Sequence, residues 1–323
     1  MQPGTTALPR SGSSALGNQR TITSRRDAFT TSMPGFRASG ARLAVSSFLP
    51  AQPAATSATA KPTPILPAVR LVSKISLTPV KGCRLLHPDE VELTAEGVVE
   101  NRRFFLVDGE GRRLRSSLTA WPTPVVARYD AATETLSLAF PDGTEAEGST
   151  VDLGEPVHGE FDGGRIVAAR VVRGPWTEPL SRLAGHPVRI VRPERPGECF
   201  VHPVTLVSEA SVERLSREAG EPVDGRRFRM LFTLTGCEPH EEDTWNGRRV
   251  RIGAAELRLG GPVPRCAVTT RSPDTGERDL DTLRVIKNYR GVRDGEAIDF
   301  GVYATVERPG RVASGDRVEL LEA

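Results

Sequence analysis

The hydrophobic and polar positions that follow residue 68 alternate mostly with the two-residue period of short β-strands. Such runs lie at 103–107 (RFFLV), 135–140 (TLSLAF), 166–172 (IVAARVV) and 188–191 (VRIV). This period places one face of a strand toward a core and the other toward solvent, so these runs predict half-buried strands. Asp142-Gly143 and Asn246-Gly247 are typical of the tight turns that join such strands.

Apolar residues recur at helical spacing in short segments at 177–185, 208–220 and 280–289. Thr177 and Ser208 stand where an N-cap is expected, and Gly185 and Gly220 stand where the first two helices should end. Many short strands with few short helices predict an α+β, mostly β architecture, built from barrel-like sheets.

Residues 1–68 have a different composition, rich in Ser, Thr, Ala, Pro and Arg, with the single acidic residue Asp27. They show no apolar periodicity, so they offer no face that could pack against a core. Two interpretations stay open, a disordered leader or a targeting segment, because transit peptides share this composition. We expect the folded part to begin at residue 69. We expect a cytoplasmic protein, or an organellar one if residues 1–68 are a transit peptide.

Composition excludes several classes of protein. Of the 323 residues, 38% are hydrophobic and 26% charged, which is usual for a globular protein. A net charge of +2 and only 5% aromatic residues give no case for a nucleic-acid partner. We expect no membrane span, because no apolar run reaches the roughly 18–20 residues required. The four cysteines, Cys83, Cys199, Cys237 and Cys266, are too scattered for a zinc or iron–sulfur site.

Cys266 follows Arg265 directly in the segment GGPVPRCAVTT. A thiol binds metals and reacts as the thiolate, which a neighbouring cation stabilises. If the segment is a strand, however, adjacent side chains point to opposite faces. Local chemistry alone therefore leaves two interpretations, an activated thiol or a buried strand cysteine beside a surface arginine.

The wider sequence resembles the MOSC domain family, the molybdenum cofactor sulfurase C-terminal-like proteins. The resemblance rests on RCAVTT followed by SPDTG, on RRFRMLFTLTG before it and on FGVYATVERPGRVASGDRVELL after it. The earlier block ISLTPVKGCRLLHPDEVELTAEGVVENRRFFLVDGEGR resembles the N-terminal β-barrel domain that accompanies MOSC in mitochondrial amidoxime-reducing components and their bacterial relatives. We therefore expect an N-terminal β-barrel domain over 69–175 and a MOSC domain over 176–323.

The resemblance implies a molybdenum cofactor, either molybdopterin or a nucleotide form of it, with Cys266 as the metal ligand and catalytic residue. A soft thiolate suits such a metal. Cationic and glycine positions match those that hold the cofactor and its phosphate, where an arginine fork grips oxygens well. They are Lys81, Gly82, Arg102 or Arg103 (the register is open by one), Arg229 and Arg265.

Three positions depart from the family pattern. Met230-Leu231 stands where many relatives have Pro-Asn, Gly82 where the amidoxime reducers tend to have serine, and Pro264 replaces a small polar residue. Glycine still offers its backbone N–H to a phosphate that approaches closely. These departures leave the expected fold intact and make an identical substrate less certain.

The resemblance implies an oxidoreductase that reduces N-hydroxylated small molecules. Because the sequence has no ferredoxin-type cysteine cluster and no flavin or nicotinamide motif, we expect electrons from a separate ferredoxin, flavodoxin or cytochrome b5-like protein. Two alternatives remain: a molybdenum cofactor carrier or binding protein without turnover, and a relative that kept the barrel but lost the cofactor.

Overall fold

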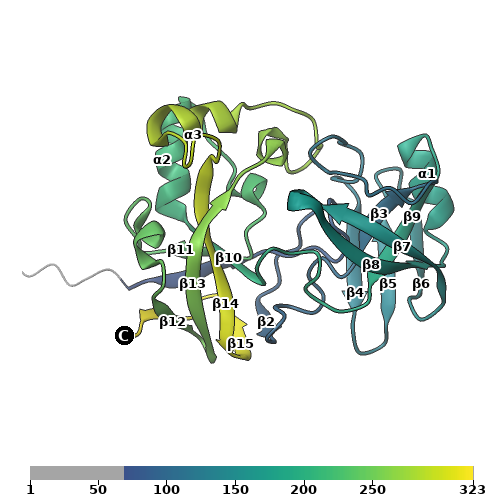
Figure 1. Cartoon of the computed structure of the whole chain (residues 1–323), viewed down its shortest axis with the longest axis horizontal. Coiled ribbons are helices and arrows are strands. Elements are labelled where there is room, and N and C mark those ends of the chain that lie inside the picture. The colour runs from purple at the N-terminus through teal and green to yellow at the C-terminus, as the bar shows by residue number, and fades with distance from the viewer. Residues whose placement is uncertain (1–68, 323) are drawn as a thin grey trace, which may run out of the picture. The chain divides into compact units, whose positions relative to one another are not determined.

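The computed structural model describes residues 69–322, and the expected leader at 1–68 lies outside the described residues. Three α-helices accompany sixteen strands in this part of the chain (Figure 1). The helices are α1 (Thr177–Ala184), α2 (Glu209–Ala219) and α3 (Thr282–Arg290). The strands are β1 (Leu71–Ile75), β2 (Glu90–Leu93), β3 (Phe105–Asp108), β4 (Val126–Asp130), β5 (Thr135–Ala139), β6 (Glu145–Ser149), β7 (Leu153–Phe161), β8 (Arg165–Val172), β9 (Val188–Pro193), β10 (Val204–Ser208), β11 (Phe232–Thr235), β12 (Arg249–Ile252), β13 (Ala255–Pro264), β14 (Asp299–Arg308), β15 (Gly310–Ala313) and β16 (Val318–Leu320). The mostly β prediction is confirmed.

The largest sheet has seven strands in the order β1-β11-β10-β14-β13-β12-β16. Its two edges nearly meet, because Leu71 bridges Arg317 and the Val318 N–H donates to the Arg70 carbonyl at 2.9 Å. Closure of this kind removes the exposed edges of a sheet and gives a barrel-like form. The two-stranded ladder β2-β15 extends from it, and α2 and α3 pack against each other beside it.

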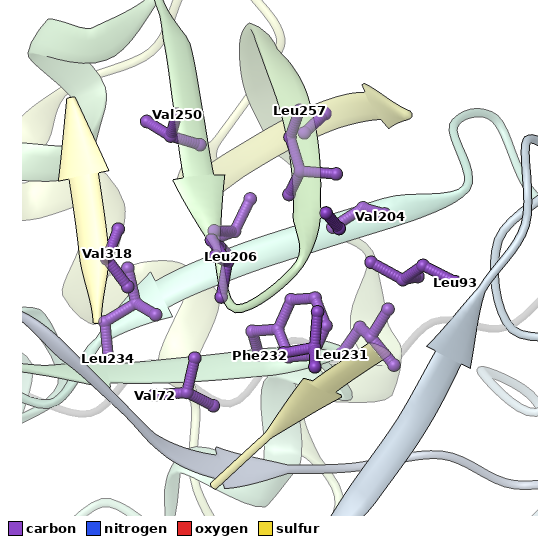
Figure 2. Packing of buried hydrophobic residues seen from close by; sticks show 14 of the residues in the cluster. Val72, Leu93, Val204, Leu206, Leu231, Phe232, Leu234, Val250, Leu257 and Val318 are labelled. Carbon is purple, nitrogen blue, oxygen red and sulfur yellow. The ribbon is translucent and has the colours of Figure 1, made fainter. Parts of the chain in front are cut away.

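The core of this sheet consists of alternate residues from strands far apart in sequence. Figure 2 shows Val72, Leu206, Leu234, Val250 and Val318 gathered in it, from β1, β10, β11, β12 and β16. All five side chains are buried. Burial of side chains of this size stabilises a fold by roughly 1.5–3 kcal/mol each.

The remaining strands form a four-stranded sheet, β3-β9-β8-β7, and a three-stranded sheet, β4-β5-β6, which we call together the N-terminal sheet pair. Their core contains Phe104, Leu136, Trp176, Leu180 and Ile190. The domain boundary expected at 175/176 stays a prediction. Helix α1 and strand β9 belong to the N-terminal sheet pair, whereas β1 belongs to the seven-stranded sheet.

The helix ends test the capping predictions. Ser208 caps α2 by accepting a hydrogen bond from the Ser211 N–H at 3.1 Å, and Gly220 ends it in the left-handed conformation, both as predicted. Gly185 ends α1 in the same way. The N-cap prediction for Thr177 is wrong, because Trp176 occupies that position and Thr177 is already the first helical residue.

Candidate functional site

One pocket of about 200 Å³ brings together nearly all the residues that the sequence singled out. Its wall contains Lys81, Gly82, Arg102, Arg229, Arg265 and Cys266. They come from loops that follow β1, precede β3, precede β11 and follow β13. Loops that converge from both groups of sheets therefore form the site.

Cys266 lies immediately outside the sheet. Strand β13 ends at Pro264, which pairs with Asp299, and the short 3-10 helix Ala267–Thr270 begins after the cysteine. The Arg265 N–H donates to the Ile298 carbonyl at 2.7 Å, and the Cys266 carbonyl accepts from the Thr269 N–H at 3.2 Å. The thiol is exposed and lines the pocket. The interpretation as a buried strand cysteine is therefore wrong, because the strand stops two residues earlier.

The other three cysteines have different surroundings. Cys83 is buried, and burial raises the pKa of its thiol to about 12. Cys199 is buried at the pocket wall, where burial raises its thiol pKa to about 11 although Lys81 and Arg102 oppose the shift. Burial likewise raises the pKa of Cys237 to about 12. These three thiols stay protonated at neutral pH, so they are poor ligands and nucleophiles.

Arg102 and Arg229 both adopt left-handed backbone conformations, with φ of 50° and 51°. Such a conformation costs a residue other than glycine of order 1–3 kcal/mol and persists only where its surroundings enforce it. Arg102 Nη2 donates to the Arg229 carbonyl at 2.9 Å, and Arg229 Nη2 donates to the Cys83 carbonyl at 2.5 Å. The strained backbone thus directs two guanidinium groups into the pocket. Each of them donates a hydrogen bond to a neutral backbone carbonyl there.

Arg265 is held by three contacts around one loop. Its Nη2 donates to the Phe228 carbonyl, its Nη1 donates to Met230 Sδ at 3.4 Å, and its guanidinium carbon lies 5.1 Å from the Phe228 ring centroid. The buried Nε has no partner among the described residues. A buried donor without an acceptor is costly, so this nitrogen is a polar group that the described residues leave unsatisfied.

The pocket is strongly cationic. Burial and, to a smaller extent, the nearby Arg102 guanidinium lower the pKa of Arg229 to about 10. Burial also lowers the pKa of Arg265 to about 10. The wall formed by described side chains contains no carboxylate, while Arg113, Arg115 and Arg165 add further cations. Buried like charges destabilise one another, so a bound anion would relieve the site.

Two segments of this chain match known domain families. Residues 190–319 match the MOSC domain, and residues 69–157 match the MOSC N-terminal beta barrel domain. This chain therefore contains a MOSC N-terminal beta barrel domain followed by a MOSC domain. Cys266, Arg229 and Arg265 lie within the MOSC domain match, whereas Lys81 and Arg102 lie within the N-terminal match.

Individual relatives are similar to this chain at low identity. The mitochondrial amidoxime-reducing component 1 of Homo sapiens is 27% identical over 300 residues, covering 80% of this chain and 85% of the relative. The Xenopus laevis protein of the same name is 27% identical over 289 residues, covering 78% and 82%. The mitochondrial amidoxime reducing component 2 of Bos taurus is 37% identical over 123 residues, covering 36% of each chain. This MOSC protein is therefore a distant relative of both components.

The MOSC N-terminal domain supplies Lys81 and Gly82. Lys81 Nζ donates to the Cys199 carbonyl at 3.2 Å and lies 5.2 Å from the Phe161 ring centroid. Gly82 has φ of 102°, a conformation that favours glycine. A Cβ on Gly82 would lie 3.4 Å from Cβ of Ser116, which also lines the pocket. Ser116 therefore offers a hydroxyl close to the place where the family pattern has serine.

The structure does not bring Arg103 into the pocket. Its Nη1 donates to the Pro193 carbonyl at 2.8 Å, on the side of β9. The choice that the sequence left open between Arg102 and Arg103 therefore favours Arg102 as the pocket residue. Sequence reasoning missed Ser116, His202 and the arginines Arg113, Arg115 and Arg165. The basic run GRRLR was a usable signal for two of these arginines.

The residues in this pocket fit a molybdenum–pterin cofactor. Several guanidinium and ammonium donors suit a phosphate, and a single accessible thiol suits a metal whose remaining ligands come from the cofactor. Residues 69–322 contain no cluster of three or more histidine, cysteine or acidic side chains that would hold a metal alone. Over the same residues, no helix combines the length and apolar character needed to cross a bilayer.

Proposed function

We propose that this MOSC protein is a molybdenum-cofactor-dependent oxidoreductase that reduces N-hydroxylated small molecules with electrons from a separate redox protein. One observation carries the proposal: an exposed thiol, Cys266, shares a pocket with four convergent cations, Lys81, Arg102, Arg229 and Arg265. The names of the amidoxime-reducing relatives support the substrate class.

Each wall residue has a defined task in this proposal. Lys81, Arg102 and Arg229 would hold the cofactor phosphate, and the guanidinium of Arg265 would add a further positive charge beside it. Cys266 would bind the metal as thiolate. Buried arginines that already contact fixed carbonyls need little reorganisation when the ligand enters, so the site is preorganised.

The reaction has a simple balance. An amidoxime takes up two electrons and two protons, its N–O bond breaks, and an amidine and water are formed. When bound, the cofactor supplies the two-electron chemistry of molybdenum, which no side chain of this protein can supply. The protein orients the substrate, and the residues of the pocket must provide a path for protons.

Molybdenum content is the first test. The protein is purified from a host that makes the cofactor, and metal per chain is measured by mass spectrometry for wild type, Cys266→Ala and Arg229→Ala. Arg258→Ala is the matched control, because Arg258 lies on β13 but pairs with Glu307 outside the pocket. We expect near-stoichiometric metal in wild type and control, and at least a tenfold loss in both pocket variants.

Turnover distinguishes an enzyme from a carrier. Benzamidoxime reduction is followed by chromatography of benzamidine, with reduced methyl viologen as the electron source. Metal-loaded protein that forms no benzamidine, but transfers its cofactor to a cofactor-free acceptor enzyme, would establish the carrier function instead. Folded wild type without metal, from a host whose other molybdenum enzymes are loaded, would refute both.

A further inference from the structure

We infer that His202 is the general acid of this site and that it protonates the hydroxyl oxygen that leaves an N-hydroxylated substrate. The inference rests on the proposed function. As the N–O bond breaks, this oxygen takes a proton from the His202 imidazolium and leaves as water. The nitrogen takes the second proton from solvent, and two electrons come from a reduced electron-transfer protein.

His202 lies in the loop between β9 and β10 and lines the same pocket as Cys266. Its ring centroid lies 4.8 Å from that of Tyr303, with the rings tilted by 51°. It is the one histidine in the described wall of this pocket. Histidine is the side chain that most readily exchanges a proton near neutral pH, which general acid catalysis requires.

The other ionisable groups that line this pocket are poor proton donors for this step. Arginine holds its proton too tightly, and phenols and lysines titrate far above neutral pH in their ordinary state. Burial raises the pKa of Cys199 to about 11, and Cys266 is the expected ligand. These groups are Lys81, Arg102, Arg113, Arg115, Arg165, Arg229, Arg265, Tyr303, Cys199 and Cys266.

His202 also borders a second cavity, of about 280 Å³, which gives it access to a source of protons. That cavity contains the carboxylates of Glu96 and Glu198 together with Arg195. Glu198 Oε1 accepts from Arg195 Nη2 at 3.1 Å, and Glu96 Oε2 accepts from Thr94 Oγ1 at 3.1 Å. A side chain that lines both spaces can take a proton on one side and release it on the other.

Close backbone packing fixes the loop that carries His202. A Cβ on Gly97 would lie 3.0 Å from the Pro203 carbonyl oxygen, and a Cβ on Gly197 would lie 2.9 Å from the Glu96 carbonyl oxygen. Both glycines also have positive φ, 98° and 80°. Only glycine permits this approach without strain, so the turn at 94–97 and the loop at 195–203 hold each other in place.

The test compares His202→Gln and His202→Phe with wild type, all loaded with molybdenum. Phenylalanine keeps a ring beside Tyr303 but has no proton to donate. We expect both variants to retain their metal and to lose about 10²-fold in kcat, the usual contribution of a general acid. His186→Gln is the control, because His186 is exposed and lies outside the pocket. It should leave kcat unchanged.

The pH profile adds the sign of the effect. A general acid acts only when protonated, so wild-type kcat should fall as the pH rises. Both His202 variants should lack this fall. If either variant keeps the wild-type kcat and profile while wild type turns over, the inference is overturned and the proposed function stands. If loaded wild type forms no benzamidine, the proposed function itself fails.

A measurement without turnover further separates a failure of this inference from a failure of the proposed function. The chain has five histidines, so ring nitrogen signals from ¹⁵N-histidine-labelled protein can be followed by NMR. The His202 signals are those missing from His202→Gln. Addition of benzamidoxime to loaded wild type, with no reductant, should shift them and leave the His186 signals in place. Unchanged His202 signals at saturating benzamidoxime would overturn the inference.

Discussion

The contact between Arg265 and Phe228 positions one cation of the pocket, and its contribution to the free energy of unfolding can be measured directly. The guanidinium carbon of Arg265 lies 5.1 Å from the Phe228 ring centroid, and that ring stacks on Phe300 at 4.3 Å. Phe228 and Phe300 are buried. We predict that Phe228→Leu removes both ring interactions while it keeps an apolar side chain in the core.

The magnitude follows from these contacts. Loss of the aromatic stack costs about 0.5–1.5 kcal/mol, and loss of a desolvated cation–π contact costs about 2 kcal/mol. Phe228→Leu should therefore lower the free energy of unfolding by about 2–4 kcal/mol, once a modest repacking cost is included. The hydrogen bond from Arg265 Nη2 to the Phe228 carbonyl remains, because the substitution leaves the backbone unchanged.

A double-mutant cycle isolates the cation–π contribution. Denaturant unfolding of the metal-free protein is measured for wild type, Phe228→Leu, Arg265→Met and the double variant, and fluorescence and circular dichroism must give coincident transitions. We expect a coupling energy of about 1–2 kcal/mol between the two positions. A coupling within about 0.3 kcal/mol of zero, the usual error of additivity, would refute the assignment of Phe228 as the residue that positions Arg265.

Three further predictions concern stability. Gly82→Ala should cost about 1–2 kcal/mol because φ is 102°, whereas Gly261→Ala, with φ outside the left-handed region and open space around it, should be nearly neutral in the same denaturation assay. Asp279→Asn should cost about 1–3 kcal/mol, since it weakens the paired hydrogen bonds of 2.6 and 2.8 Å to the buried Arg227; a thermal unfolding transition that does not change would contradict this. Burial, with Arg290 beside it, lowers the pKa of His240 to about 4, so the unfolded chain binds this proton more readily. The contribution of His240 to the free energy of unfolding is complete above its unfolded pKa of about 6.5, and it is lost as the pH falls toward 4. Because the ring is only half-buried, His240→Gln should reduce the loss of unfolding free energy between pH 7 and 4.5 by about 1–2 kcal/mol, measured against wild type.

The sequence placed the regular elements better than it placed the pocket. Two-residue alternation identified strands such as β5, and helical spacing with a serine cap identified α2, because a single local pattern determines each element. Arg102 and Arg103 could not be separated by the same reasoning. The left-handed backbone at Arg102 determines which guanidinium faces the pocket, and the surrounding fold enforces that conformation.

Residues that are distant in sequence were harder still. Ser116 approaches Gly82 across 34 positions, and His202 meets Tyr303 across about a hundred, so no local period relates either pair. Cys266 was ambiguous because the sequence does not show that β13 stops at Pro264. The family resemblance supplied Cys266 as a candidate, and the geometry of the strand end exposes its thiol.

The path of the chain explains why the pocket residues escape periodic patterns. Strand β1 belongs to the seven-stranded sheet, β3 and β9 belong to the N-terminal sheet pair, and β10 returns to the seven-stranded sheet. Lys81 lies between β1 and the β2-β15 ladder, Arg102 lies between that ladder and β3, and His202 lies between β9 and β10. The side chains of such segments do not follow the two-residue period of either sheet, so they can face the pocket. Their positions depend on both cores at once. We therefore expect a destabilising substitution in either core to move the pocket cations apart before the other core unfolds.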